Sequence, residues 1–118
     1  MTGLAVTYGL TADQGATFEY VLTWTNPDGT PIDLTGYTAR MQIRRRTTSQ
    51  QLVETLTTEN GKITLGGEDG TITLNLSDAD TAAMAPAQHQ YDLELVSSGG
   101  EVTRLLMGYF VVRPEMTR

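Results

Sequence analysis

The chain has no cysteine, one histidine and one lysine among its 118 residues. Without cysteine it forms no disulfide, no thiolate metal site and no cysteine nucleophile. No apolar run approaches the roughly 18 residues that a membrane-spanning helix needs. Its first eight residues also lack the basic and apolar regions of a secretory signal. We therefore expect a protein that is made in a cytoplasm and does not bind membranes.

Positive charge is also scarce. Eight Lys and Arg residues stand against 14 Asp and Glu residues, which gives a net charge of -6 and a pI near 4.5. General nucleic-acid binding requires a positive surface, so we expect no nucleic-acid partner. The length is that of one ordinary domain, and no linker, low-complexity tract or repeat divides it. The sequence therefore predicts a single domain over residues 1–118.

Short apolar-polar alternations separated by turn residues dominate what is present. In residues 56–76, such alternations flank Asn60-Gly61 and the segment Gly67-Glu-Asp-Gly70. Asn-Gly and Asp-Gly tolerate the positive φ of tight hairpin turns, so each is predicted to reverse the chain. On this interpretation, a strand over 52–56 pairs through Asn60-Gly61 with a short strand over 62–65.

The same period of two continues along the chain. Further strands are predicted over 18–25, 38–44, 71–76, 90–96 and 101–112, with turns at 26–29 and 98–100. The only helical candidate is 77–84, where Ser77 or Asp78 can cap the first turn and Pro86 ends it. Reversals every 8–12 residues predict an all-β, antiparallel two-sheet sandwich of seven or eight strands, with one short helical turn near 78–84.

Several side chains could carry chemistry, but each has a simpler interpretation. His89 lies in a polar strand entry and is expected at the surface. Asp78 and Asp80 lack the oxygen-ligand spacing of a calcium loop and are better explained as helix-capping acids. Asp92 and Glu94 share one strand face, which is more typical of a solvated face than of a glycosidase pair. We expect no enzyme activity, no catalytic residues, no cofactor and no metal.

Four arginines form the most distinctive charge cluster. Arg40, Arg44, Arg45 and Arg46 hold half of the positive charge of the chain. They can protect an edge strand from unwanted pairing. They can also dock an acidic neighbour, because arginine makes bidentate bonds to carboxylates. We take these four residues as the candidate partner-docking site.

Two aromatic residues offer a different kind of site. Trp24 and Tyr20 could stack on a sugar ring, but they alternate with Phe18 and Leu22, which indicates a core-facing position. We expect Trp24 in the core. A carbohydrate-binding module nevertheless remains an alternative to a protein-docking module.

Nearly the whole chain from about Thr17 resembles a family of small structural proteins of tailed bacteriophages and prophages. The motifs that carry the resemblance run from Asn26-Pro-Asp-Gly-Thr-Pro-Ile-Asp-Leu-Thr-Gly to Arg44, and over 56–65, 69–77, 91–95 and 102–106. They are similar to the N-terminal domain of phage baseplate upper proteins. The resemblance implies an immunoglobulin-like sandwich that anchors other parts to the tail, with no catalytic residues to transfer.

A role in the particle follows from this resemblance as an expectation. Baseplate upper proteins continue into stalk and receptor-binding segments, whereas this chain stops at Arg118. We expect a virion protein, made in the bacterial host cytoplasm, that acts as a tail, baseplate or neck adaptor in several symmetric copies. A capsid decoration protein is the alternative. Residues 1–16 are a candidate N-terminal arm, and 114–118 a C-terminal tail, which a partner would order.

Overall fold

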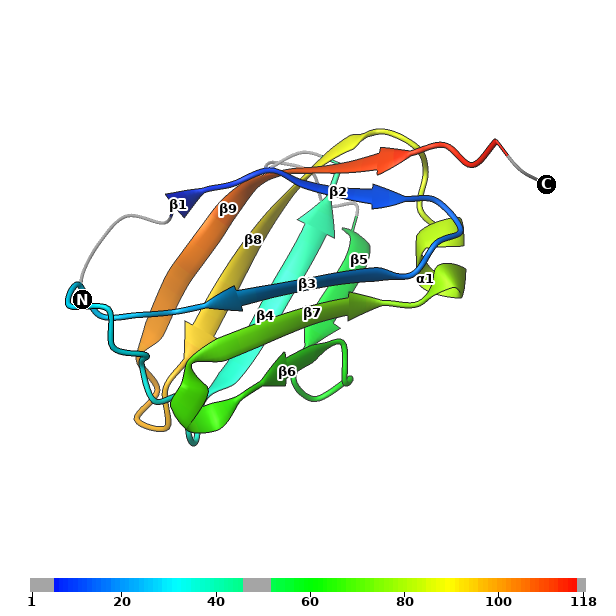
Figure 1. Cartoon of the computed structure of the whole chain (residues 1–118). Helices are drawn as coiled ribbons and strands as arrows, with labels where there is room; N and C mark the ends of the chain where they lie inside the picture. Colours follow the sequence, from blue (N-terminus) through cyan, green and yellow to red (C-terminus); the bar gives the residue numbers. More distant parts are fainter. Residues whose placement is uncertain (1–5, 46–51, 117–118) are drawn as a thin grey trace.

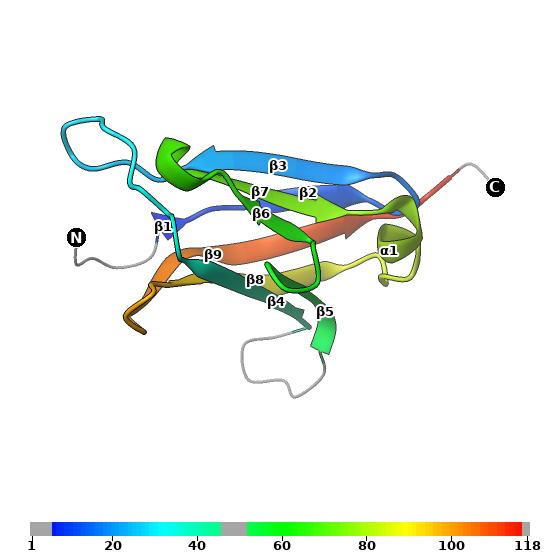
Figure 2. The same ribbon diagram turned by 90° about the horizontal axis from the view of Figure 1, so that it is seen from below.

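Two β-sheets pack face to face in the computed structural model, which describes residues 6–45 and 52–116 (Figures 1 and 2). The strands are β1 (Val6–Thr7), β2 (Leu10–Asp13), β3 (Phe18–Thr23), β4 (Thr38–Arg44), β5 (Leu52–Thr57), β6 (Ile63–Leu65), β7 (Thr71–Leu76), β8 (Gln88–Val96) and β9 (Val102–Arg113). A 3₁₀ turn, η1 (Gly67–Asp69), and one short helix, α1 (Asp78–Ala82), complete the described elements.

The strand order confirms the predicted fold class. The larger sheet, called sheet A, has the order β1-β9-β8-β4-β5, with β2 also paired to β9. The smaller one, sheet B, has the order β3-β7-β6. β1 and β2 are successive pieces along one edge of β9, so the described residues form eight strands when these are counted together. The described residues therefore form an all-β sandwich of two sheets, in which every pairing is antiparallel as predicted except that of β1 and β2 with β9, which is parallel.

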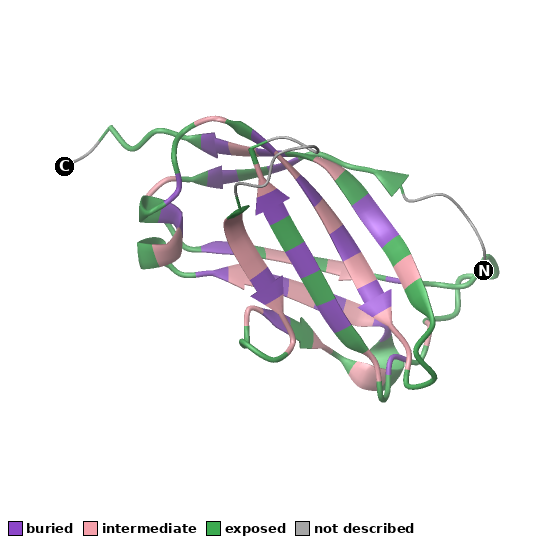
Figure 3. Ribbon diagram, turned by 180° about the vertical axis from the view of Figure 1, so that it is seen from behind, coloured by how far each residue is buried: buried purple, intermediate pink, exposed green. Residues whose placement is uncertain are grey.

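The core lies between the sheets and follows the predicted alternation. In β7 every second residue is buried, and the same stripes cross β4 and β8 in Figure 3. The fully buried apolar side chains are Met41, Ile43, Leu56, Ile72, Leu74, Leu93, Leu95 and Phe110. Opposite faces of the same strands carry polar residues, so each sheet presents one outer face to solvent.

The N-terminal segment differs from the expected arm. β1 and β2 pair in parallel with β9 in one continuous register, from Val6 opposite Leu106 to Asp13 opposite Arg113. Leu10 is only 3% exposed and forms part of the core. Residues 6–13 therefore belong to the domain, because the alternation in Leu10-Thr-Ala-Asp13 fits an edge strand. Residues 1–5, 117 and 118 lie outside the described residues, and 114–116 are exposed beyond β9.

The predicted hairpin at Asn60-Gly61 is wrong, although the turn itself exists. β5 pairs with β4 in sheet A, whereas β6 pairs with β7 in sheet B, so this turn carries the chain between sheets. The Asn60 side chain holds the crossing: its Oδ1 accepts from the backbone N–H groups of Thr57 and Lys62, each at 3.0 Å. The reversal at Gly67–Gly70 is confirmed, because it joins the antiparallel strands β6 and β7.

Helix α1 begins with the predicted cap. The Ser77 hydroxyl accepts from the Asp80 N–H at 3.1 Å, and the Asp80 carboxylate accepts from the Ser77 N–H at 3.0 Å. The buried Thr81 hydroxyl donates to the Ala16 carbonyl at 2.8 Å. This bond ties α1 to the turn between β2 and β3, so the helix closes one end of the sandwich.

Candidate docking surface

The structure places the arginine cluster at the end of β4. Arg40 and Arg44 point to the outer face of sheet A, as the alternation predicted, and Arg45 follows them at the surface. Arg46 lies outside the described residues. The cluster is therefore a strand face rather than an isolated loop patch.

Strand pairing brings acidic residues between basic ones on this face. Because β8 lies next to β4, Arg40 meets Glu94, and its Nε lies 2.8 Å from Glu94 Oε1. From the other side, Arg104 of β9 reaches Asp92 at 3.4 Å and Glu94 at 3.6 Å. The result is a ladder of alternating charge across three strands.

Sequence reasoning missed Arg104 and the pairing of Asp92 and Glu94 with the arginines. The period of two already placed both acids on one outer face, but it could not show which strand lies beside them. Neighbour order is a property of the whole sheet, so the ladder appears only once β8 is placed between β4 and β9.

These ion pairs contribute little to stability, but they set the pattern of charge on the outer face of sheet A. The side chains of Arg40 and Arg104 are more than half exposed, and pairs between exposed charges are typically worth only about 0–1 kcal/mol. However, the sheet holds the backbone from which these side chains project in a fixed position. A partner with complementary charges therefore meets a largely preorganised pattern.

The acidic centre of the ladder is electrostatically crowded. Partial burial raises the pKa of Asp92, and the neighbouring Glu94 raises it further, while Arg104, Arg44 and Arg40 oppose that shift. The net direction of the Asp92 pKa is upward, because burial, the largest cause, and the Glu94 charge together outweigh the three arginines. An additional cation from a partner would be favourable here.

Apolar side chains adjoin the ladder on β9. Met107 is 38% exposed and lies opposite Asp92, and Tyr109 is 51% exposed and lies opposite Gln90. A hollow of about 260 Å³ lies between Arg44, Arg104 and Met107. Tyr, Met and Arg are the residue types enriched in protein interfaces. We call the following set the charged face: Arg40, Gln42, Arg44, Gln90, Asp92, Glu94, Arg104, Met107 and Tyr109.

His89 is not at the surface, which corrects the sequence-based expectation. Its side chain is fully buried, its Nε2 lies 2.9 Å from the Ala85 carbonyl oxygen, and its Nδ1 has no partner among the described residues. The strand begins at Gln88, two residues before the predicted start, so His89 falls in phase with inward Tyr91. Extending the period of two by one step would have found it.

The predicted core position of Trp24 is confirmed. Trp24 is 9% exposed and meets Tyr37 edge to face, with ring centroids 6.2 Å apart. Tyr20 is half-buried, and its ring packs 5.6 Å from that of Tyr8. Trp24 therefore does not offer the exposed flat ring that sugar stacking requires.

Within residues 6–45 and 52–116, no three His, Asp or Glu side chains come together as a metal site would require. The one α-helix found there, α1, is too short to span a bilayer. Comparisons of the sequence with protein-family models and with curated proteins gave no match.

Proposed function

We propose that the chain is a non-enzymatic structural protein of a bacteriophage particle. In this role it is a tail, baseplate or neck adaptor that docks other particle proteins. The observation that carries the docking role is the charged face, where a fixed ladder of arginines and carboxylates adjoins the exposed Met107 and Tyr109. Such a surface combines orientation by charge with apolar area to bury.

The bacteriophage assignment rests on the turn-and-strand motifs, not on the charged face. Asn26–Leu34 and the segments of β7 and β8 resemble baseplate upper domains, and these segments form the turns and central strands of this sandwich. A capsid decoration protein would use the same face on another neighbour. Repeated copies around a symmetric particle would present the face in a ring.

Particle composition tests the proposal. We would compare particles assembled with the wild-type chain and with the double variant Arg104→Glu and Met107→Lys, using quantitative mass spectrometry of purified particles. The matched control is Thr64→Lys, on the outer face of sheet B. We expect the wild type and the control at equal copy number, and at least a tenfold loss of the double variant.

Two results would contradict the proposal. If the wild-type chain is absent from purified particles, the virion role is wrong. If the double variant is folded and is incorporated as well as the control, docking does not use the charged face. Circular dichroism of each purified variant separates loss of docking from loss of folding.

A further inference from the structure

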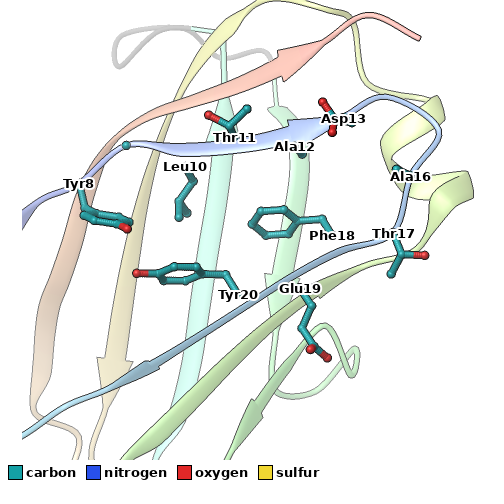
Figure 4. Close-up of a pocket in the computed structure, with 11 residues that line it drawn as sticks. Tyr8, Leu10, Thr11, Ala12, Asp13, Ala16, Thr17, Phe18, Glu19 and Tyr20 are labelled. Atoms are coloured by element: carbon teal, nitrogen blue, oxygen red, sulfur yellow. The ribbon is translucent and has the colours of Figure 1, made fainter. Parts of the chain in front are cut away.

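A second surface, separate from the charged face, lies where β2 and β3 face each other. These strands belong to different sheets and are joined by the turn at residues 14–17, so they form an arch. A groove of about 450 Å³ runs between them, lined by residues 8–13 and 16–20. In Figure 4, Leu10, Phe18, Tyr8 and Tyr20 point into the space between the two strands.

The first half of β3 forms one wall of the groove, and the unpaired edge of β3 continues beyond the groove to Thr23. All six residues of β3 pair with β7 without a register shift. At its end, the Trp24 N–H donates to the Gly70 carbonyl, and therefore even-numbered residues of β3 direct their backbone groups to β7. The backbone N–H and C=O groups of Glu19, Val21 and Thr23 consequently point away from β7.

The opposite wall is the unpaired edge of β2. The Tyr8 N–H donates to the Met107 carbonyl at 2.8 Å, and the Gln14 N–H to the Arg113 carbonyl at 2.9 Å. Even-numbered residues of this segment therefore face β9. By the same alternation, the backbone groups of Thr11 turn away from β9, whereas the Asp13 carbonyl accepts from the Ala16 N–H at 3.1 Å within the turn.

The β3 edge lacks the devices that usually block strand pairing. It contains no proline, no bulge and no lysine, and only one charge, Glu19. Val21, at its centre, is 53% exposed. Sheet B has three strands among the described residues, whereas the comparable sheet of an immunoglobulin domain has four. The missing position is the edge of β3.

We propose that this groove is a strand-addition site. An extended, basic polypeptide segment of a partner protein enters between β2 and β3 and pairs with the backbone edge of β3. The proposal does not depend on the bacteriophage assignment, nor on the charged face.

The charges of the groove select a basic segment. Among the described residues, Asp13 and Glu19 are the only charged residues that line it, both are acidic, and the Glu19 carboxylate lies at the β3 rim, turned away from the space between the strands in Figure 4. Arg113 already pairs with Asp13, whereas Glu19 forms no ion pair with the described residues. Because Leu10 and Phe18 already fill the floor, side chains that enter the groove must be small. We therefore expect small apolar residues on one face of the guest strand, and a lysine or arginine opposite Glu19.

Hydrogen exchange with a defined peptide tests the pairing directly. The probe is acetyl-Val-Thr-Val-Lys-Val-Thr-amide, and the control peptide has Glu in place of Lys. In the free protein, the amides of Val21 and Thr23 should exchange fast, and those of Tyr20 and Leu22 slowly. With saturating probe, we expect at least tenfold slower exchange at Glu19, Val21 and Thr23, and no change at Tyr20 or Leu22.

Two variants separate edge pairing from other binding. Val21→Pro removes an N–H that β7 does not use, so the fold should persist while probe affinity falls at least tenfold; Val21→Thr is its matched control. Glu19→Lys, which leaves the backbone untouched, should reverse the preference between the Lys and Glu peptides. Amide NMR spectra would establish that each variant is folded.

The proposal is overturned by any of four results. Saturable binding could be absent at millimolar probe, or protection could fall on the edges of β5 or β6. Folded Val21→Pro and Glu19→Lys could bind both peptides as the wild type does. Finally, the β3 amides could become protected with rising protein concentration alone, which would make a second copy of the chain the occupant.

Discussion

Gly108 shows how one residue fixes the path of the N-terminal segment. Its φ is +152°, and a Cβ at this position would overlap the backbone of Tyr8 where that segment crosses β9. The Tyr8 carbonyl in turn accepts a hydrogen bond from the buried Tyr91 hydroxyl at 2.8 Å. The absence of a side chain at Gly108 thus permits the contact between three strands.

Gly108→Ala should therefore destabilise the fold. Both the unfavourable φ and the displacement of Tyr8 contribute, and we expect a loss of about 2 kcal/mol or more in the free energy of unfolding. Urea denaturation measures it. Gly99→Ala, at an exposed turn position outside the positive-φ glycines, where a Cβ would make only an ordinary contact with the Ser97 hydroxyl at 3.9 Å, is the control and should change stability by less than about 1 kcal/mol.

His89 supports a second prediction at this scale. Its buried Nδ1 has no partner among residues 6–45 and 52–116, so an apolar side chain should fit nearly as well. Ala85 is exposed, and water can satisfy its carbonyl once the imidazole is gone. His89→Leu should change the free energy of unfolding by less than about 1.5 kcal/mol, whereas His89→Asp should cost at least about 3 kcal/mol. Equal losses for both variants would show that the imidazole bond itself is required.

Among the elements, β2 decides whether the N-terminal segment belongs to the domain. Leu10 is buried and Thr11, its neighbour, is exposed. Leu10→Ala should cost about 2–4 kcal/mol of unfolding free energy, and Thr11→Ala less than about 0.5 kcal/mol. Equal and negligible effects in urea titrations would restore the interpretation of this segment as a free arm.

The α1 cap yields a prediction about pH. The hydrogen bond from the Ser77 N–H is the main cause that lowers the pKa of Asp80, and the nearby Lys62 adds to it. A lowered folded-state pKa gives stability that is present above the ordinary value of 3.8 and is lost as pH falls through the folded-state value. Asp80→Asn should cost about 1 kcal/mol at pH 7, and it should lose less stability than the wild type between pH 5 and pH 2.

Most elements could be predicted from the local sequence, whereas the pairing between elements that are distant in the chain could not. Turns at Asn26–Gly29 and Gly67–Gly70, and the Ser77 cap, depend on neighbours in sequence, and the structure confirms them. The sheet to which a strand belongs depends on the whole fold, so the hairpin predicted at Asn60-Gly61 is wrong. The charge ladder escaped detection for the same reason, because Arg104 and Glu94 meet only across a pair of strands.

At the scale of the whole molecule, the first strand closes the fold against the last. Val6 pairs with Leu106 and Leu10 with Phe110, each one hundred positions apart in the chain. Such non-local contacts form slowly, because the chain must close a long loop before they form. We expect a refolding time between about 1 ms and 1 s. Stopped-flow fluorescence of Trp24, the only tryptophan, measures it. Refolding within microseconds would contradict this expectation.

The parallel pairing of β2 with β9 also determines how the domain responds to mechanical load. The two strands run in the same direction, so the chain enters at the β1 end of the sandwich and leaves at the opposite end (Figure 1). A force that separates Val6 from Arg113 therefore slides the strands past each other along their length. All hydrogen bonds between them share this load at once instead of opening one by one, so the domain resists extension by shear.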